Sequence, residues 1–148
     1  MRLLRWTIPM IVLLAAVPAA NAAAVVHRAR AKPQALSDGT IVRIVTLGHG
    51  PGITVGQKAT MRYTGWLLTA GKRGRKFDAS ADHGGTFTFT LGVQEVIGGW
   101  DSGVAGMKAG GRRTLIVPPA AGYGPQGAGA DIPGNATLIF DIELVKID

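Results

Sequence analysis

The most informative pattern of apolar and polar residues lies within positions 91–117. Its apolar side chains recur at gaps of three and four residues, which places them on one face of a helix. These positions are Val96, Ile97, Trp100, Val104 and Met107. Gly98 and Gly99 each weaken a helix by about 1 kcal/mol relative to alanine, and Gly110 and Gly111 are expected to end it. Because a helix this short is marginal alone, the pattern predicts that other elements pack over its apolar face.

Most of the remaining chain has the alternation that is typical of short strands between turns. The expected strands cover residues 40–47, 59–68, 76–78, 86–91, 112–117 and 137–147. In the second of them, Gly65 indicates a bulge or a close backbone approach. In the fourth, Phe87 and Phe89 fall on one side and threonines on the other. Short strands with one helix favour an α+β fold, in which a strongly twisted antiparallel sheet wraps over the helix.

Three segments between these elements are expected to lack regular structure. Residues 49–52, with the sequence HGPG, are expected to form a turn or loop. Residues 69–76 are expected to form an exposed basic loop. Residues 120–134 are rich in glycine, alanine and proline, and a loop that long in a small domain is usually functional. No internal repeat or domain break divides residues 36–148, so one folded domain is predicted there.

The N-terminus has the composition of a secretory signal. Arginines precede an apolar stretch at 8–17, and residues 20–22 (ANA) offer a small-residue cleavage site. We therefore expect a signal peptide at 1–22, a flexible lead-in at 23–35, and an exported protein that is periplasmic or secreted, with no stable membrane insertion after cleavage. The alternative is an uncleaved anchor, because residues 23–26 lengthen the apolar run toward the ~20 residues that span a bilayer.

The composition excludes several kinds of chemistry. The 148 residues include no cysteine, which rules out disulfides, thiolate metal sites and a cysteine nucleophile. The three histidines are paired with no serine or carboxylate at a recognisable nucleophile spacing, and the sequence contains no metal-ligand cluster. We therefore expect neither a metal nor a cofactor.

The formal net charge of +7 suits either a polyanion-binding protein or simply a soluble basic protein. Four of the basic residues form a cluster: Lys72, Arg73, Arg75 and Lys76. No aromatic residue interleaves them to stack on bases, so no nucleic-acid partner is expected and a solubilising loop is the favoured interpretation. Polyanion binding by this loop is kept as a weaker alternative.

A series of ordered blocks with fitting spacing resembles the FKBP-type peptidyl-prolyl cis–trans isomerases. The blocks are YTG at 63–65, FDAS at 77–80, FTF at 87–89, QEVIGGWD at 94–101, GVAGMK at 103–108, GYG at 122–124, IP at 132–133 and ATLIFDIEL at 136–144. No single block would be specific, but their order over residues 36–148 is.

The resemblance implies a fold, an activity and partners. The fold would be a five- or six-stranded antiparallel half-barrel around one short helix, and the activity would be rotation about the peptide bond that precedes proline. The partners would be proline-containing peptides, unfolded proteins and macrolide inhibitors such as rapamycin. The chain leaves no room for a dimerisation arm, so we expect a monomer. The alternative is a module of the same fold that binds proline-containing chains or a partner protein with little turnover.

The resemblance also implies a set of site residues. Trp100 would form the floor of a pocket and Phe140 one of its walls, with Asp78 near the twisting amide. The hydroxyl of Tyr123 would donate to a ligand carbonyl, as would the backbone amide of Ile97. The catalytic candidates are Asp78, Trp100, Tyr123 and Phe140. The substrate-binding candidates are Tyr63, Phe77, Phe87, Val96, Ile97 and Ile132. An alternative role for Asp78 is a cap or bridge within the sheet.

Some positions depart from the pattern of the family. Ala121, Gly122 and Gly134 stand where relatives commonly carry a larger residue, an alanine and a proline respectively, which predicts a smaller or looser loop before the last strand. His83 stands where relatives often carry a basic residue, and we interpret it as a solvated loop residue.

The implied reaction suits a chain without nucleophiles or metal ligands, because it makes and breaks no covalent bond. Its barrier is the loss of amide resonance, ~18–20 kcal/mol. A catalyst therefore needs a dry cavity that accepts a proline ring and one or two hydrogen-bond donors, and the apolar and aromatic candidates above can supply that cavity.

Overall fold

The computed structural model describes residues 31–148, and the predicted signal peptide lies outside the described residues, as do positions 23–30 of the predicted lead-in. The strands are β1 (Gln34–Ala35), β2 (Ile41–Thr46), β3 (His49–Gly52), β4 (Lys58–Thr69), β5 (Lys72–Ala79), β6 (Phe87–Thr90), β7 (Lys108–Ala109), β8 (Arg112–Val117) and β9 (Leu138–Ile147). The α-helix is α1 (Gly98–Val104), and the 3₁₀ helices are η1 (Ser80–His83), η2 (Pro119–Ala121) and η3 (Gly124–Gln126). Within residues 31–148, no helix is both long and apolar enough to cross a membrane.

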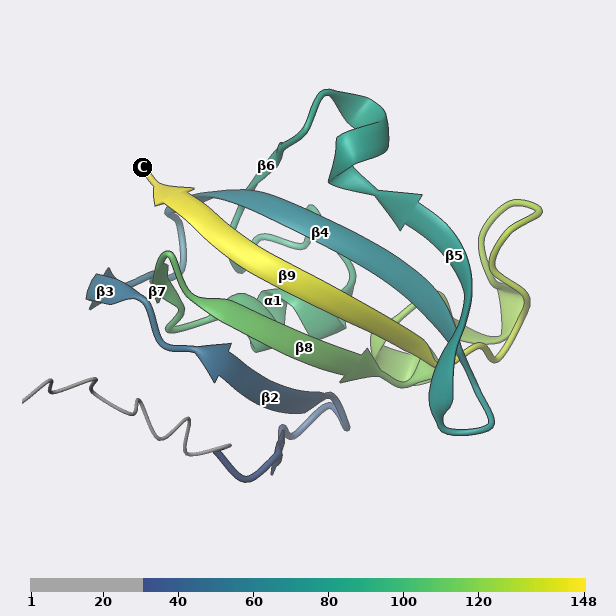
Figure 1. Ribbon diagram of the computed structural model, residues 1–148. Coiled ribbons are helices and arrows are strands. Elements are labelled where there is room, and N and C mark those ends of the chain that lie inside the picture. Colours follow the sequence, from purple (N-terminus) through teal and green to yellow (C-terminus); the bar gives the residue numbers. More distant parts are fainter. Residues whose placement is uncertain (1–30) are drawn as a thin grey trace, which may run out of the picture.

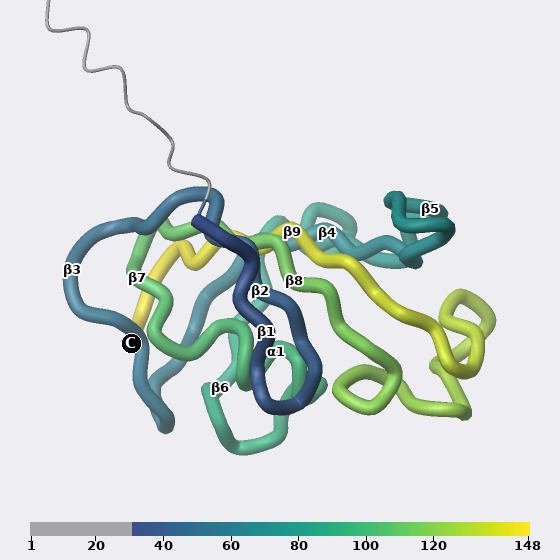
Figure 2. Tube along the Cα trace, turned by 90° about the horizontal axis from the view of Figure 1, so that it is seen from below, coloured from purple at the N-terminus to yellow at the C-terminus, as the bar shows by residue number. Residues whose placement is uncertain are grey.

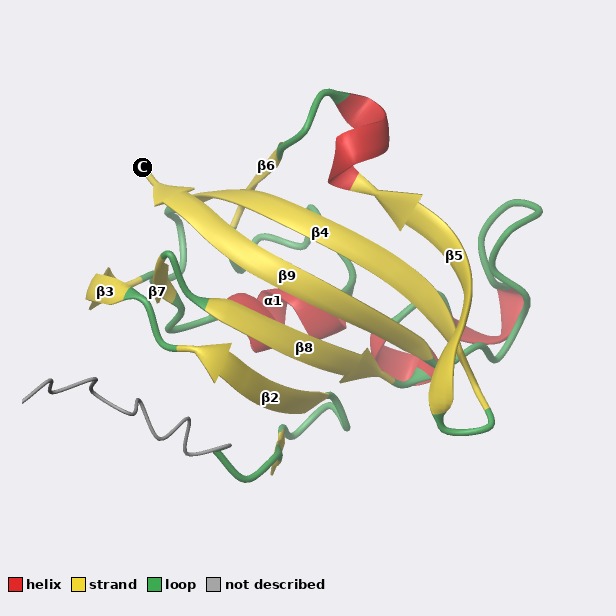
Figure 3. Cartoon of the chain, viewed as in Figure 1, coloured by secondary structure: helices red, strands yellow, loops and turns green. Residues whose placement is uncertain are grey.

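Seven of the strands form one antiparallel sheet in the order β1-β2-β8-β9-β4-β5, and β6 pairs with the first residues of β4. The sheet crosses the molecule as a twisted layer, with α1 behind β8 and β9 (Figures 1 and 3). Seen from below, α1 lies on one side of the strands (Figure 2). The predicted α+β fold with a twisted antiparallel sheet over one helix is confirmed. The sheet has one strand more than the five or six that were predicted. The additional strand, β1, pairs with β2 and consists of the last two residues of the predicted lead-in.

The core lies between α1 and the sheet. Trp100 and Val104 project from the helix and are 4% and 0% exposed. They belong to one cluster with buried side chains of the central strands, namely Met61, Leu115, Val117, Leu138, Phe140, Ile142 and Leu144. Burying each large apolar side chain contributes about 1.5–3 kcal/mol, so the sheet supplies the stabilisation that a seven-residue helix lacks on its own.

The helix is shorter than the apolar pattern predicted. It begins at Gly98 and ends at Val104, so Val96 and Ile97 precede it and Met107 follows it. The expectation that the helix ends at the glycines 110–111 is therefore wrong. The chain leaves the helix at once, since Ala105 is extended and Gly106 has a φ of 73°.

The helical glycines allow close contact with the sheet. A Cβ atom at Gly99 would lie 2.6 Å from Val117 Cγ1 and 3.0 Å from Thr40 Oγ1, and one at Gly103 would lie 2.8 Å from Leu115 Cδ1. These positions therefore exclude even a methyl group. The helix propensity that Gly99 sacrifices is offset by the packing of the helix backbone directly on β8.

We expect Gly99→Ala to destabilise the domain by about 1–3 kcal/mol, because a methyl group would force apart a packed helix and strand. The adjacent Gly98→Ala is the matched control: its Cβ atom would lie 3.7 Å from Ala121 O, which is ordinary contact. This second change should stabilise the helix by up to about 1 kcal/mol. Urea unfolding of the two variants measures both effects, and equal shifts in the same direction would contradict the packing argument.

Two segments that were predicted as loops are strands. Residues 49–52 form β3, which pairs with β7 through His49 and Ala109. Residues 72–76 belong to β5, and the turn before them is only Ala70 and Gly71, with φ values of 49° and 73°. The bulge expected at Gly65 is confirmed, since the pairing of β4 with β5 shifts register between Gly65 and Trp66.

Candidate active site

A cavity of about 250 Å³ opens between the sheet and the segment that leads into α1. Its volume is just below the usual range for small-molecule sites, about 300–1,000 Å³, which suits a small ring rather than a large planar cofactor. Nine of the ten candidate site residues line it, together with Glu95. The lining residues are Tyr63, Phe77, Asp78, Phe87, Glu95, Val96, Ile97, Trp100, Tyr123 and Phe140.

Trp100 lies at the centre of an aromatic cluster. Four rings lie at an angle to its indole, with centroids 5.1 to 6.2 Å away, namely those of Tyr63, Phe140, Phe89 and Phe87. Each such pair contributes about 0.5–1.5 kcal/mol beyond its buried area. Mutual contacts of this kind fix the orientation of the indole, so the lining of the cavity is formed before any ligand enters.

Gly65 allows one further ring of the lining, Phe77, to meet Phe140 over the strand. A Cβ atom at this position would lie 2.6 Å from the Phe77 ring and 2.8 Å from the Phe140 ring. Those two rings meet edge to face with centroids 5.5 Å apart. The groups that approach Gly65 closely are therefore aromatic side chains and not, as the alternative to a bulge had it, another backbone segment.

Asp78 is the most highly coordinated polar group of the cavity. The Tyr63 hydroxyl donates to its Oδ2 at 2.7 Å, the Ala79 amide donates to its Oδ1 at 2.9 Å, and His83 Nε2 lies 2.7 Å from the same Oδ1. Burial raises the pKa of Asp78, but the hydrogen bonds from Tyr63 and His83 outweigh it and hold the pKa below its usual value. Burial and the Asp78 carboxylate raise the pKa of Tyr63. At neutral pH the pair is therefore a carboxylate and a neutral phenol.

Two polar residues near the cavity were not among the predicted site residues. His83 is solvent-exposed, as predicted, with 64% of its side chain accessible, but η1 also places its Nε2 2.7 Å from Asp78 Oδ1, a contact that was not predicted. The signal was its spacing of five residues from Asp78. Glu95 lines the cavity, and its carboxylate accepts a hydrogen bond from the Thr90 amide at 2.8 Å.

Tyr123 and Ile132 both come from the loop before β9. Tyr123 lines the cavity and remains 40% exposed, and burial together with the Asp78 charge raises the pKa of its hydroxyl. That hydroxyl therefore stays protonated and available as a donor. Ile132 is the candidate that the structure does not place on the cavity: it is 7% exposed, joins the core and pairs through its backbone with Ala128.

Comparison with known proteins agrees with this arrangement. Residues 50–145 match the family model described as FKBP-type peptidyl-prolyl cis-trans isomerase. The chain belongs to this family. It is therefore an FKBP-type peptidyl-prolyl cis–trans isomerase, as the sequence blocks predicted.

Individual relatives extend the match over most of their own length. FK506-binding protein 1 of Gibberella zeae is 52% identical over 105 residues, covering 70% of this chain and 94% of that protein. An FK506-binding protein of Neisseria meningitidis serogroup B is 48% identical over 109 residues, covering 74% and 96%. Among solved structures, AtFKBP13 superposes with a TM-score of 0.71 at 35% identity, covering 79% of this chain and 99% of that one. FkpA from Escherichia coli superposes with a TM-score of 0.70 at 33% sequence identity, covering 78% of this chain and 51% of that one.

The loop before β9 in this FKBP domain is held in place from two directions. Arg75 on β5 donates to the Asp131 side chain and to its backbone carbonyl, both at 2.6 Å. A Cβ atom at Gly134 would lie 2.1 Å from Pro125 O, so glycine is required for the close packing of the loop on η3. Of the two predicted effects, a smaller or a looser loop, the close packing at Gly134 agrees with the smaller loop.

The predicted basic cluster is largely neutralised by acidic partners. Arg73 donates twice to Asp141, at 2.7 and 2.9 Å, and Lys76 lies 3.0 Å from Asp82. With Arg75 bound to Asp131, three of the four basic residues have a carboxylate in contact. This pairing weakens the alternative of a polyanion site on the hairpin.

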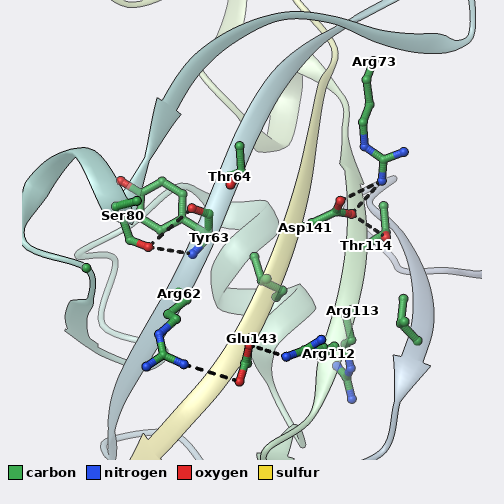
Figure 4. A pocket seen from close by; sticks show the side chains of 14 residues that line it. Arg62, Tyr63, Thr64, Arg73, Ser80, Arg112, Arg113, Thr114, Asp141 and Glu143 are labelled. Carbon is green, nitrogen blue, oxygen red and sulfur yellow. Dashed lines mark hydrogen bonds and ion pairs between the residues drawn. The ribbon is translucent and has the colours of Figure 1, made fainter.

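A second concave region, about 730 Å³, lies on the face of the sheet turned away from α1 (Figure 4). Its two carboxylates, Asp141 and Glu143, pair with arginines on other strands of the sheet. Glu143 lies 3.7 Å from Arg62 and 3.0 Å from Arg112, and Asp141 accepts from Thr114 at 2.7 Å as well as from Arg73. Since these groups satisfy one another on an open surface, the region offers less than the aromatic cavity does for the chemistry of the family.

Proposed function

We propose that the cavity above Trp100 receives the proline ring of a substrate and that this isomerase acts on proline-containing segments of unfolded, exported proteins. One observation carries the proposal: nine candidate side chains from six separate parts of the sequence converge on a single small cavity, which is lined mainly by aromatic and aliphatic residues and has the Asp78 carboxylate in its wall. A proline ring is apolar and small, so such a cavity can bury it.

The proposed mechanism is non-covalent. A planar amide carries negative charge on its carbonyl oxygen, and twisting the bond removes part of that charge. Moving the amide from water into an apolar cavity therefore destabilises the planar state more than the twisted one. A carboxylate near the oxygen, as at Asp78, acts in the same direction. Lowering the barrier by ~4 kcal/mol would accelerate rotation about a thousandfold.

The remaining candidate roles concern how the chain is held. We assign the Tyr123 hydroxyl and the Ile97 amide to carbonyl groups that flank the proline, with Phe87 and Phe140 as walls against the ring. Ile132 supports the loop that carries Tyr123 and takes no direct part. The names of the fungal and Neisseria relatives contain FK506, which supports macrolides such as rapamycin as ligands of the same cavity.

Export rests on the signal-like composition of residues 1–22. We propose a monomer that is released after cleavage to the periplasm or the medium, with 36–148 as its isomerase domain. Retention by an uncleaved N-terminal anchor is the alternative. Mass spectrometry of the protein from intact cells decides between them, because cleavage after Ala22 leaves a new N-terminus at Ala23.

The activity is tested by NMR exchange spectroscopy on an X-Pro tetrapeptide with the purified protein. We expect cis–trans exchange to be much faster than the uncatalysed reaction, which takes tens of seconds or longer. We also expect rapamycin to abolish the acceleration. A folded protein that binds the peptide without accelerating exchange would instead support the alternative of a binding module.

A further inference from the structure

The contact between His83 and Asp78 is placed where a change of charge can act on the reaction. His83 Nε2 lies 2.7 Å from Asp78 Oδ1, while Oδ2 of the same carboxylate accepts from Tyr63. An ionised carboxylate only accepts hydrogen bonds, so Nε2 must donate. The His83 side chain is 64% exposed, so the ring is in contact with solvent as well as with Asp78.

The other polar groups around this contact come from β4, β5, η1, the segment before α1 and the loop before β9. Asp82, beside His83, pairs with Lys76 at 3.0 Å. Tyr63 and Tyr123 both have raised pKa values and stay neutral. Among the described groups around Asp78, His83 is the one whose side-chain type ordinarily changes charge between about pH 5 and about pH 8. Glu95, in the segment before α1, is a second carboxylate of the same cavity lining, and it accepts a hydrogen bond from the Thr90 amide.

We propose that His83 is a positioning residue that makes the isomerase activity fall in mild acid. In its neutral form the imidazole holds the Asp78 carboxylate with one hydrogen bond and leaves the negative charge at the cavity. In its protonated form the imidazolium forms an ion pair with Asp78 and cancels most of that charge. The inference rests on the proposed function, because it assigns a regulator to the same cavity.

The direction of the effect follows from the charge distribution of the amide. The planar amide has more negative charge on its oxygen than the twisted amide has. A carboxylate beside the oxygen therefore favours the twisted state, whereas a neighbouring cation favours the planar state and raises the barrier. A charge change within contact distance of Asp78 should alter the rate by about threefold to tenfold.

The test compares kcat/KM at about pH 5 and about pH 8 by NMR exchange spectroscopy, with a tetrapeptide substrate whose ends are blocked and which has no titrating side chain. Three variants accompany the wild type. His83→Gln keeps a donor but stays neutral, His83→Arg stays charged, and Asp82→Asn alters a neighbouring carboxylate without touching Asp78.

We expect the wild type and Asp82→Asn to lose about threefold to tenfold in kcat/KM in acid, with the midpoint matching the titration of the His83 ring protons in NMR spectra. His83→Gln and His83→Arg should each give the same value at both pH values, with the arginine variant the lower of the two. A wild type that is active but independent of pH, or a glutamine variant that keeps the acid loss, overturns the inference alone. A folded wild type that is inactive at about pH 8 overturns the proposed function as well.

Discussion

Replacing Trp100 by leucine should reduce kcat/KM by at least about tenfold while leaving a folded domain. The indole meets four other rings and lines the cavity, so leucine removes the surface on which the proline ring rests. The smaller side chain also leaves a gap in the core beneath it, at a loss of about 1–3 kcal/mol in the free energy of unfolding. NMR exchange on an X-Pro peptide and urea unfolding measure the two effects separately.

Phe89→Leu is the matched control for this change. Phe89 is 2% exposed and contacts the same indole at 5.8 Å, yet it is not among the residues that line the cavity. We expect a comparable loss of stability, with kcat/KM within about twofold of the wild type. If the two variants lose activity in the same proportion, Trp100 acts through the core and not as the floor of the site.

The strands in which apolar and polar residues alternate could be predicted from the sequence, because the alternation reflects which of their side chains are buried. Phe89 is buried and Thr88 exposed along β6, and Leu138, Phe140, Ile142 and Leu144 are all buried along β9. Such a period of two specifies which side of a strand faces the core. The aromatic site followed for a related reason, since the blocks that resemble the family contain the same side chains that line the cavity.

The errors arose where a remote partner determines the structure. The HGPG segment has no strand pattern, and β3 forms because β7, which follows α1, pairs with it. The charged residues of β5 are likewise held by β4 and by Asp131 and Asp141 of later segments. Helix propensity predicted only that Gly99 weakens the helix, whereas the close contact with Val117 leaves no space for a larger residue at this position. Local pattern contains none of these distant contacts.

The contact between His83 and Asp78 depends on residues that are close in sequence, yet it could not be predicted from their pattern. Both residues were visible in the sequence, but whether they meet depends on the four-residue turn η1, which ends at Gly84 with a φ of 88°. A spacing of five residues fits several loop shapes. Only the tight 3₁₀ turn brings the ring back onto the carboxylate.

Asp78→Asn should reduce kcat/KM by about tenfold or more, without unfolding the domain. The carboxylate accepts three donors, from Tyr63, Ala79 and His83. An asparagine side chain has one oxygen and one NH₂ group, so at least one of these donors must face another donor. The negative charge near the substrate carbonyl is lost as well. Peptide exchange by NMR checks the activity, and chemical shifts of the aromatic rings report whether the cavity keeps its shape.

The same variant should also change how stability depends on pH. The pKa of Asp78 is below its usual value in the folded protein, so the unfolded chain binds a proton more readily than the folded one. Its stabilising contribution is therefore present above the unfolded carboxyl value of about 3.9 and is lost as the pH falls through the lower folded pKa. The difference in unfolding free energy between wild type and Asp78→Asn should shrink as the pH drops below about 4.

Asp82→Asn, which removes a surface partner of Lys76 at 3.0 Å, is the control and should keep kcat/KM within about twofold. An Asp78→Asn protein as active as this control would mean that the carboxylate only supports the fold.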